Sequence, residues 1–318
     1  MYIRLLFVVL FAQFIYAGAD KSLQESKLII NTYKHIDKTK NSQLNVTNTI
    51  SKKNFKYKYN KKQKPKTKAN DLKKFDYSKN NITIVVDPGH GGEDPGAVGM
   101  GGAKEKDITL SISKQVKYIL TKNMPGIRIF LTRNKDITIS LPARTDFANQ
   151  MQATVFVSLH VNSSLNRDIY GIETYYLNIS HDKYSLRLAA RENAMTEEET
   201  SNLEFILADL SMKSSVYDSF NFGRIMQYSL CGNLAEQWDN VRNLGIKNAM
   251  FYVLMGAKMP AVLIEASFVS SNIEEQRLES CDYQYAAAEG IANGIQRFVE
   301  EKIFSDQFDT NKLRNKWS

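Results

Sequence analysis

Short apolar runs alternate with amphipathic segments from residue 82 almost to the end of the chain. Apolar runs of four to eight residues between turn residues are typical of buried strands, and apolar positions three or four apart are typical of helices. The pattern predicts strands over 82–86, 127–131, 155–159, 171–177 and 261–264, and helices over 108–120, 140–150 and 283–302. Strands that alternate with helices indicate an α/β fold.

Residues 190–222 interrupt this alternation. They hold the acidic cluster Glu197–Glu199, then an apolar run over 203–210 and a stretch rich in Ser and Met. Within the run, apolar side chains recur at the spacing that forms one face of a helix. These side chains are Leu203, Ile206, Leu207 and Leu210. We interpret the region as an insertion between a strand and a helix that begins near Asp218.

The first nineteen residues resemble a secretory signal. A single cationic residue, Arg4, precedes an apolar stretch, and the segment closes with the small residues Ala17-Gly18-Ala19. This arrangement is typical of a signal peptide that is cleaved, and the apolar stretch is too interrupted for a stable membrane span. We therefore expect the mature protein in the periplasm or secreted into the cell envelope.

Residues 20–80 are dominated by lysine. Seventeen Lys and no Arg stand against five acidic residues, with few apolar residues between them. Such a segment cannot bury enough apolar surface to offset the entropy lost on ordering, so it is predicted to be a disordered linker. It could bind anionic groups of the envelope or serve only as a solvated spacer. Secretion makes nucleic acid an unexpected partner.

The remaining residues are long enough for one domain with a sizeable core. We place this domain at 81–303 and a C-terminal tail at 304–318. Because the linker carries more positive charge than the whole chain's +8, the domain itself is mildly acidic. Cys231 and Cys281 are the two cysteines. Export permits a disulfide between them, but the sequence does not fix their distance, so the pairing stays open.

Four side chains near predicted strand ends form a candidate metal site. His90 follows the turn Asp87-Pro88-Gly89, His160 ends the most apolar strand, and Glu265 ends the run Val262–Ile264. Glu105 follows a glycine-rich loop that could fold back toward His90. Open α/β sheets place their sites at the carboxyl ends of strands. Two imidazoles and one carboxylate are a common ligand set for catalytic Zn²⁺ and leave a fourth position for water.

Each of these residues also has a purely structural explanation. A lone histidine is often a core residue, and Glu105 near a helix N-terminus could interact with the helix dipole. Asn162, close behind His160, could hold the second ring nitrogen of that histidine or a substrate amide. Glu265 is harder to explain structurally, because a carboxylate at the end of an apolar strand is costly unless it is paired or functional. Burial would raise its pKa toward the range useful to a general base.

Six motifs, in this order, resemble those of the zinc-dependent N-acetylmuramoyl-L-alanine amidases of bacterial cell walls. The similarity covers about residues 82–300. The motifs are Asp87-Pro88-Gly89-His90-Gly91-Gly92, Asp94-Pro95-Gly96-Ala97, Glu105-Lys106, Leu131-Thr132-Arg133, Val157-Ser158-Leu159-His160-Val161-Asn162 and Val262-Leu263-Ile264-Glu265.

The resemblance implies one catalytic Zn²⁺ held by His90, Glu105 and His160, with Glu265 as catalytic base. It implies a mixed, mainly parallel sheet flanked by helices on both faces in a single catalytic domain. The implied reaction on peptidoglycan is hydrolysis of the amide between N-acetylmuramic acid and the first L-alanine of the stem peptide. The implied role is cell-wall remodelling and daughter-cell separation.

Some amidases of this family that act in cell separation carry a helix that covers the zinc until an activator protein removes it. The insertion 190–222 is similar in its position. Its acidic residues Glu192, Glu198, Glu199 or Glu204 could reach the open zinc position as a self-inhibiting ligand, and an activator protein could act on this insertion. The alternative is a surface helix with solvated acidic side chains.

Two other functions remain open at this point. A zinc peptidase or deacetylase acting on another envelope amide would need the same ligands, because the ligands do not define which amide is cut. A catalytically silent wall-binding regulator could use the same fold. The presence of all four polar residues, His90, Glu105, His160 and Glu265, argues against the silent regulator.

Overall fold

A computed structural model of the chain describes residues 77, 80–180, 182–201 and 213–314, without the side chains of 213–215 and 304–314. Six strands form one sheet in the order β2-β1-β3-β6-β4-β5. The strands are β1 (Thr83–Pro88), β2 (Arg128–Leu131), β3 (Val155–Asn162), β4 (Ile172–Leu177), β5 (Asn243–Ala249) and β6 (Ala261–Phe268). All neighbouring pairs are parallel except β4 and β6, which are antiparallel. The predicted mixed, mainly parallel sheet is confirmed.

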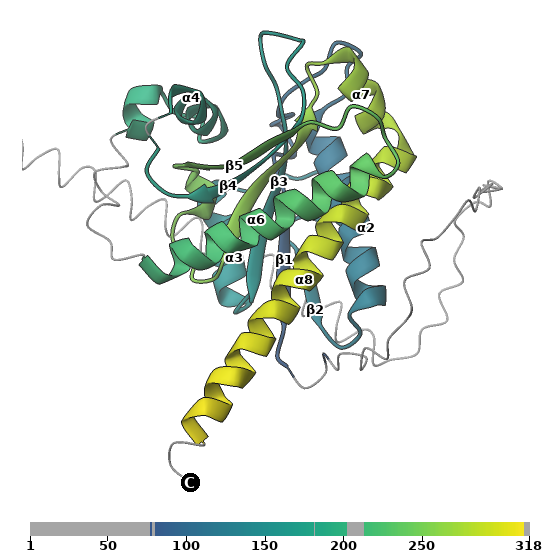
Figure 1. Cartoon of the computed structure of the whole chain (residues 1–318). Coiled ribbons are helices and arrows are strands. Elements are labelled where there is room, and N and C mark those ends of the chain that lie inside the picture. Colours follow the sequence, from purple (N-terminus) through teal and green to yellow (C-terminus); the bar gives the residue numbers. More distant parts are fainter. Residues whose placement is uncertain (1–76, 78–79, 181, 202–212, 315–318) are drawn as a thin grey trace, which may run out of the picture.

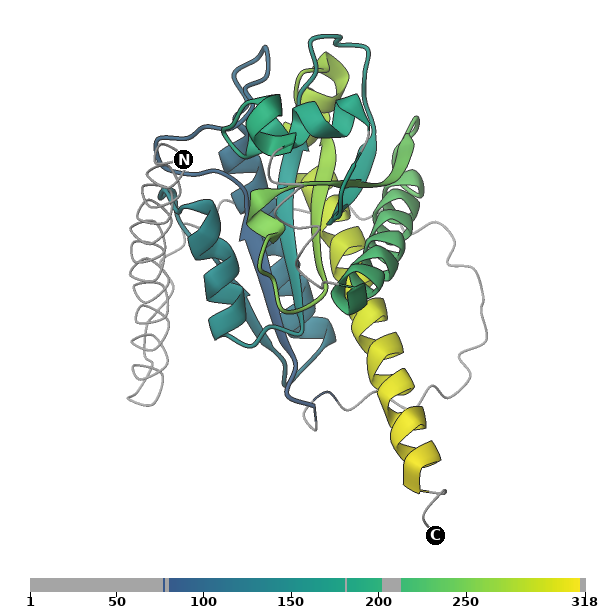
Figure 2. The ribbon, with the colours of Figure 1, turned by 90° about the vertical axis from the view of Figure 1, so that its left-hand side faces the viewer.

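Helices cover both faces of this sheet (Figure 1). They are α2 (Glu105–Asn123), α3 (Leu141–Gln150), α4 (Lys183–Glu192), α6 (Lys213–Ala235), α7 (Asn272–Glu279) and α8 (Cys281–Arg314), with a short 3₁₀ helix η2 (Tyr252–Leu254). Figure 2 shows the sheet between α3 on one side and α6 and α8 on the other.

Each face of the sheet has its own apolar core. The core beneath α2, α6 and α8 contains Val86, Val157 and Ile264. The core beneath α3, α4 and η2 contains the alternate strand residues Val85, Phe156 and Leu263. Because successive strand residues point to opposite faces, continuous apolar strands fill both cores. The three central strands, β1, β3 and β6, are buried along their whole length.

Several elements differ from the sequence-based expectations. Helix α2 begins at Glu105 itself, and α6 begins at Lys213, five residues before the expected start near Asp218. β5, α4 and α7 were not predicted. β5 escapes the pattern because it is an edge strand of mixed polarity, with Gly245 and two asparagines among its seven residues.

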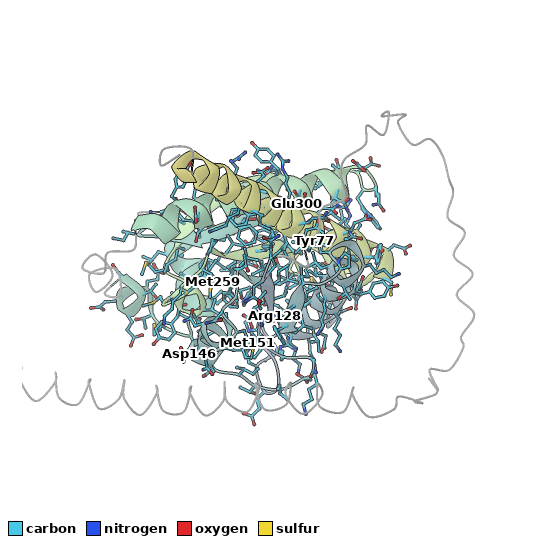
Figure 3. The ribbon with its side chains drawn as sticks, turned by 90° about the horizontal axis from the view of Figure 1, so that it is seen from below. Tyr77, Arg128, Asp146, Met151, Met259 and Glu300 are labelled. Atoms are coloured by element: carbon cyan, nitrogen blue, oxygen red, sulfur yellow. The ribbon has the colours of Figure 1, made fainter. Side chains whose placement is uncertain are left out.

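The first described residue, Tyr77, lies against the C-terminal helix α8. Tyr77, which falls within the predicted linker, is buried and donates its hydroxyl hydrogen to the carboxylate of Glu300. Gln296 donates a second hydrogen bond, 3.0 Å long, to the same tyrosine oxygen. Figure 3 shows Tyr77 next to Glu300 of α8. α8 itself continues to Arg314, through most of the predicted tail 304–318.

The predicted signal peptide and nearly all of the predicted linker lie outside the described residues, as do Leu203, Glu204, Ile206, Leu207 and Leu210 of the insertion. Among the described helices, none combines the length and the hydropathy needed to cross a membrane. Both cysteines carry free thiols, Cys231 buried in α6 and Cys281 exposed at the start of α8.

Candidate metal centre

Three of the residues predicted to bind zinc meet at the carboxyl end of the central strands. His90 lies in the turn after β1, Glu105 is the first residue of α2, and His160 lies near the end of β3. Oε1 of Glu105 is 3.1 Å from Nε2 of His90 and 3.0 Å from Nδ1 of His160. The sequence interval between His90 and Glu105 is a loop that returns to β1, as the glycine-rich segment predicts.

A fourth ligand-type group joins them from α4. Oε2 of Glu192, the last residue of that helix, lies 3.2 Å from Nε2 of His90 and 3.2 Å from Nδ1 of His160. The four potential ligand atoms of His90, Glu105, His160 and Glu192 all lie within 4.8 Å of one another. Of the insertion's candidate acids, Glu192 is the one placed here; Glu198 and Glu199 are exposed to solvent.

The turn that presents His90 has an unusual backbone. His90 has φ of 58°, in the left-handed region that side chains other than glycine seldom adopt, so the surrounding structure must hold it there. Two buried arginines do so. Arg144 donates to the carbonyl oxygens of Pro88 and His90, both at 2.8 Å. Arg133 donates to the carbonyl oxygens of Pro88 at 3.0 Å and Gly89 at 2.6 Å.

Two glycines permit the close packing of the ligands. A Cβ on Gly89 would stand 2.5 Å from Cε1 of His160, and a Cβ on Gly96 would stand 2.6 Å from Oε2 of Glu105 and 2.6 Å from Cδ2 of His90. Atoms this close overlap. Glycine at these positions therefore lets the backbone touch the ligand side chains directly.

A further set of contacts orients the ligands. The Nδ1 side of the His90 ring is 2.7 Å from Oδ2 of Asp94, which leaves Nε2 facing the centre. Glu105 accepts hydrogen bonds from the backbone N–H of Val161 at 2.9 Å and of Ala97 at 2.8 Å. A carboxylate partner on a ligating histidine fixes its ring and raises its basicity.

The centre is buried and yet holds several carboxylates, which shift the pKa values of the two histidines. Burial disfavours a charged imidazole, but the carboxylates of Glu105 and Asp94 outweigh it and raise the pKa of His90 to about 12. For His160, Glu105 and Glu192 likewise outweigh burial and raise the pKa to about 9. Burial would raise the pKa of Glu105, yet the two imidazoles lower it to about 2. The same field favours any cation placed between these groups.

The donor set fits a divalent metal ion. Nε2 of His90 and Oε2 of Glu192 are buried and point into the centre, but their contacts there are not aligned as hydrogen bonds, so neither atom has a hydrogen-bond partner. Buried polar atoms are nearly always partnered, so these two mark a place for a ligated cation. Two imidazoles with carboxylate oxygens suit zinc and its first-row neighbours.

Glu265 lies directly beside this group. In the parallel register of β3 and β6, it is the partner of His160, so both side chains lie on the same face of the sheet. It is completely buried, and neither of its carboxylate oxygens has a hydrogen-bond partner. Burial, reinforced by the negative charge of Glu192, raises the pKa of Glu265 well above its usual range.

A polar network continues along the sheet from Glu265. Glu173 of β4 is its antiparallel register partner and is bonded to Nζ of Lys247 at 2.6 Å. Nδ2 of Asn162 donates to Glu173 at 3.3 Å and to the hydroxyl of Tyr184 at 3.0 Å. Asn162 therefore holds groups of β4 and α4 and does not bond the second nitrogen of His160.

The structure thus brings together His90, Glu105, His160 and Glu265, the four residues predicted from the sequence. Sequence reasoning quoted Asp94 and Arg133 within motifs but assigned them no role, and it missed Arg144, Glu173 and Arg191. Arg144 carried no signal of its own. Its position inside a helix gave no reason to expect a side chain that reaches the turn after β1.

Comparisons with known proteins agree with this arrangement. The family model for N-acetylmuramoyl-L-alanine amidase matches residues 84–297. The N-acetylmuramoyl-L-alanine amidase AmiC of Neisseria meningitidis is 32% identical over 228 residues, which cover 69% of this chain and 53% of that protein. The chain spans about half the length of the curated relatives that it matches first.

Two solved structures are similar along the same part of the chain. AmiC2 of Nostoc punctiforme is 31% identical with a TM-score of 0.53, covering 69% of this chain and 97% of that one. The CwlD amidase of Clostridioides difficile, solved in complex with the GerS lipoprotein, is 25% identical with a TM-score of 0.52, covering 69% and 99%. On the family match and on the convergence of these motifs at one site, the chain belongs to the N-acetylmuramoyl-L-alanine amidase family.

Proposed function

We propose that this protein is a zinc-dependent peptidoglycan hydrolase that cleaves the amide between N-acetylmuramic acid and L-alanine of the stem peptide. The observation that carries the proposal is the convergence of His90, Glu105 and His160 within 3.1 Å contacts, with the partnerless Glu265 alongside. Membership of the amidase family supports this choice of amide over that of a peptidase or deacetylase. The four intact groups argue against a silent wall-binding regulator.

In this proposal, His90, Glu105 and His160 hold the zinc. Bound there, zinc would lower the pKa of a water molecule to about 7 and polarise the scissile carbonyl. Glu265 removes a proton from the attacking water as the new carbon–oxygen bond forms. It then delivers that proton to the amide nitrogen as the carbon–nitrogen bond breaks, which gives a carboxylic acid and a free amine. Burial raises the pKa of Glu265 above its usual range, which makes its carboxylate a stronger base than an exposed one.

The proposed setting is the cell envelope. The predicted signal peptide would export the chain to the periplasm or beyond, where peptidoglycan lies, and a role in wall remodelling and daughter-cell separation follows from that substrate. The predicted lysine-rich linker 20–80 would then act as an envelope-binding segment or as a spacer. Binding of the full chain and of a variant lacking 20–80 to purified sacculi separates these two roles, because a spacer can be deleted without loss of binding.

Mass-spectrometric analysis of digested peptidoglycan tests the activity. We expect free stem peptides that begin with L-alanine, and we expect Glu265→Gln to lower kcat by a hundredfold or more, an effect of the size of general-base loss. Zinc content should stay unchanged in Glu265→Gln and fall in His160→Ala. Products cut at any other amide would contradict the proposal.

We also propose that Glu192 inhibits the enzyme by occupying the position that the attacking water needs. The position of its Oε2 atom between the two histidines supports this, as does the 6% exposure of its side chain. A group bound at that position must leave before water can enter, so the closed state is inactive. An activator protein that displaces α4 would switch the enzyme on. A CwlD amidase bound to a partner lipoprotein offers a parallel.

Substitution of Glu192 tests the inhibition. We expect Glu192→Ala to raise basal hydrolysis without any activator. The increase should equal the ratio of closed to open molecules in the parent enzyme. Glu198→Ala, on the same insertion but exposed to solvent, is the matched control and should leave the basal rate unchanged. Equal basal rates for both variants and the parent enzyme would overturn the inhibitory role while leaving the amidase assignment intact.

A further inference from the structure

Two hydrogen-bond acceptors at the end of β3 hold the residue next to Glu192. Oδ1 of Asn162 accepts from Nη2 of Arg191 at 3.0 Å, and the carbonyl oxygen of Ser163 accepts from Nη1 of Arg191 at 2.9 Å. Both acceptors follow His160 by two and three residues, so they lie at the rim of the metal centre. Their occupant belongs to α4, the helix whose last residue blocks that centre.

The strands and their side chains fix the direction of the Asn162 amide. Its Nδ2 donates to Glu173 on β4, and its Oδ1 also accepts from the backbone N–H of Ser163 at 2.7 Å. Glu173 in turn is held by Lys247 at 2.6 Å and by the hydroxyl of Tyr175 at 2.7 Å. These contacts come from strands and the loop after β3. Nδ2 also donates to Tyr184 of α4 at 3.0 Å, so without α4 the amide is oriented by the bond to Glu173 and by the Ser163 N–H.

Removal of Glu192 from the centre also removes Arg191. The two residues are adjacent, and Arg191 also donates to Oε1 of Glu192 at 3.0 Å. Once α4 withdraws, Asn162 Oδ1 loses its bond from Arg191 and keeps only the one from the Ser163 N–H, while the Ser163 carbonyl loses its bond from Arg191. Each oxygen then has a lone pair that a ligand's N–H group can fill.

We propose that Asn162 Oδ1 and the Ser163 carbonyl form a subsite that binds backbone N–H groups of the substrate's peptide, and that Arg191 fills this subsite in the closed state. The proposal rests on the proposed amidase function. On one side of the scissile amide the substrate is a peptide, whose N–H donors are neutral and match two neutral acceptors. Arg191 and Glu192 together then act as an internal competitor: the guanidinium occupies the peptide subsite, and the carboxylate occupies the metal centre.

The test removes the competitor first. In the full chain carrying Arg191→Ala and Glu192→Ala, Asn162→Ala should raise KM by about tenfold, the usual effect of one lost hydrogen bond to a buried acceptor, and change kcat by less than twofold. The substrate is an N-acetylmuramoyl tetrapeptide whose stem begins with L-alanine. Calorimetric binding of the free tetrapeptide should weaken by the same factor, which provides a readout other than turnover.

A second substrate identifies which part of the molecule the subsite binds. Methylation of the second peptide nitrogen of the stem removes one N–H donor, and we expect it to raise KM about tenfold when Asn162 is present. Methylation should add nothing in the Asn162→Ala background. Asn178→Ala, an exposed asparagine beyond β4, is the matched control and should leave both constants unchanged. Zinc content and thermal unfolding of each variant show whether the fold survives.

Each unfavourable outcome has its own meaning. If Asn162→Ala has no effect once Arg191 is gone, Asn162 only anchors α4 and the subsite proposal is wrong. If Asn162→Ala raises KM but methylation of the second peptide nitrogen does not, the subsite does not bind that N–H, and its assignment to the peptide backbone at this position is overturned. If the Arg191→Ala, Glu192→Ala parent cleaves no muramoyl peptide at all, it is the amidase function that fails.

Discussion

The metal centre has two halves that are held in different ways. His90, Glu105, His160 and Glu265 come from the turn after β1, the start of α2 and two central strands, all packed into the main cores. The turn is fixed by Arg133 and Arg144, whose exposures are only 1% and 3%. Such side chains cannot leave without breaking the fold. We call these residues the fixed half.

The second half is Glu192, the last residue of the ten-residue helix α4 at the edge of the site. We call it the releasable half. α4 is held at its first turn by Tyr184 and at its end by Arg191, whose side chain is 42% exposed. Behind the helix, Asn193 donates to the carbonyl of Met250 at 2.7 Å. Polar contacts of this kind can exchange for water at small net cost, whereas Leu188 and Ala189 of α4 also pack into the core beneath the helix and must be exposed when it leaves. If the proposed function holds, the comparison indicates a permanently built active site and a block that can be released.

The largest effect is expected from the fixed half. Arg144 forms a buried ion pair with Asp87 at 2.8 Å, and this pair, despite the opposing effect of burial, keeps the pKa of Asp87 below its usual range. Arg144→Met strands the aspartate in the core and should lower the free energy of unfolding by about 3–5 kcal/mol. Urea unfolding of the variant and the parent measures this difference in the free energy of unfolding. Arg128→Met, on the exposed side of edge strand β2, is the control, and a similar cost for both variants would show that the contacts of Arg144 do not stabilise the turn.

A smaller effect is expected where the backbone touches a ligand. In Gly89→Ala the new methyl group would overlap the His160 ring, which is buried and cannot swing away, so zinc affinity should fall by about 10- to 100-fold. Competition with a chromophoric chelator measures that affinity. Gly232→Ala, in helix α6 with no atom within 4 Å of the added carbon, should bind zinc like the parent. Unchanged affinity in Gly89→Ala would mean that the turn shifts to accommodate the methyl group.

The fixed half was largely predictable from the sequence because it is made of strong local patterns. The strands β1, β3 and β6 are nearly continuous apolar runs, so their ends were easy to locate. His90 and His160 stand out at those ends because histidine is rare in the chain. Polar side chains at the carboxyl ends of neighbouring parallel strands lie close together, so these positions, with the motifs around them, allowed a candidate metal site to be predicted.

The releasable half could not be predicted to the same detail. Four acidic residues of the insertion were equal candidates, and the choice of Glu192 depends on where α4 ends relative to β3, which no local pattern encodes. The tertiary contacts of Arg133 and Arg144 are similarly invisible, because each joins atoms more than 40 residues apart. Strand β5 was missed because tertiary pairing with β4 overrides its weak propensity.

The smallest effect should come from the N-cap of α4, Asp182, and it tests whether α4 opens separately from the fixed half. Asp182 accepts from the backbone N–H of Ser185 at 2.9 Å, and the hydrogen bonds from Ser185 lower its pKa. Its stabilisation is therefore present above the unfolded-state pKa and is lost as pH falls through the lower folded-state value. Asp182→Ala should cost about 1 kcal/mol and speed amide exchange in α4 about fivefold, with α2 unaffected. Asp168→Ala, an exposed loop variant, is the control; equal acceleration in α2 and α4 would mean that α4 does not open independently of the fixed half.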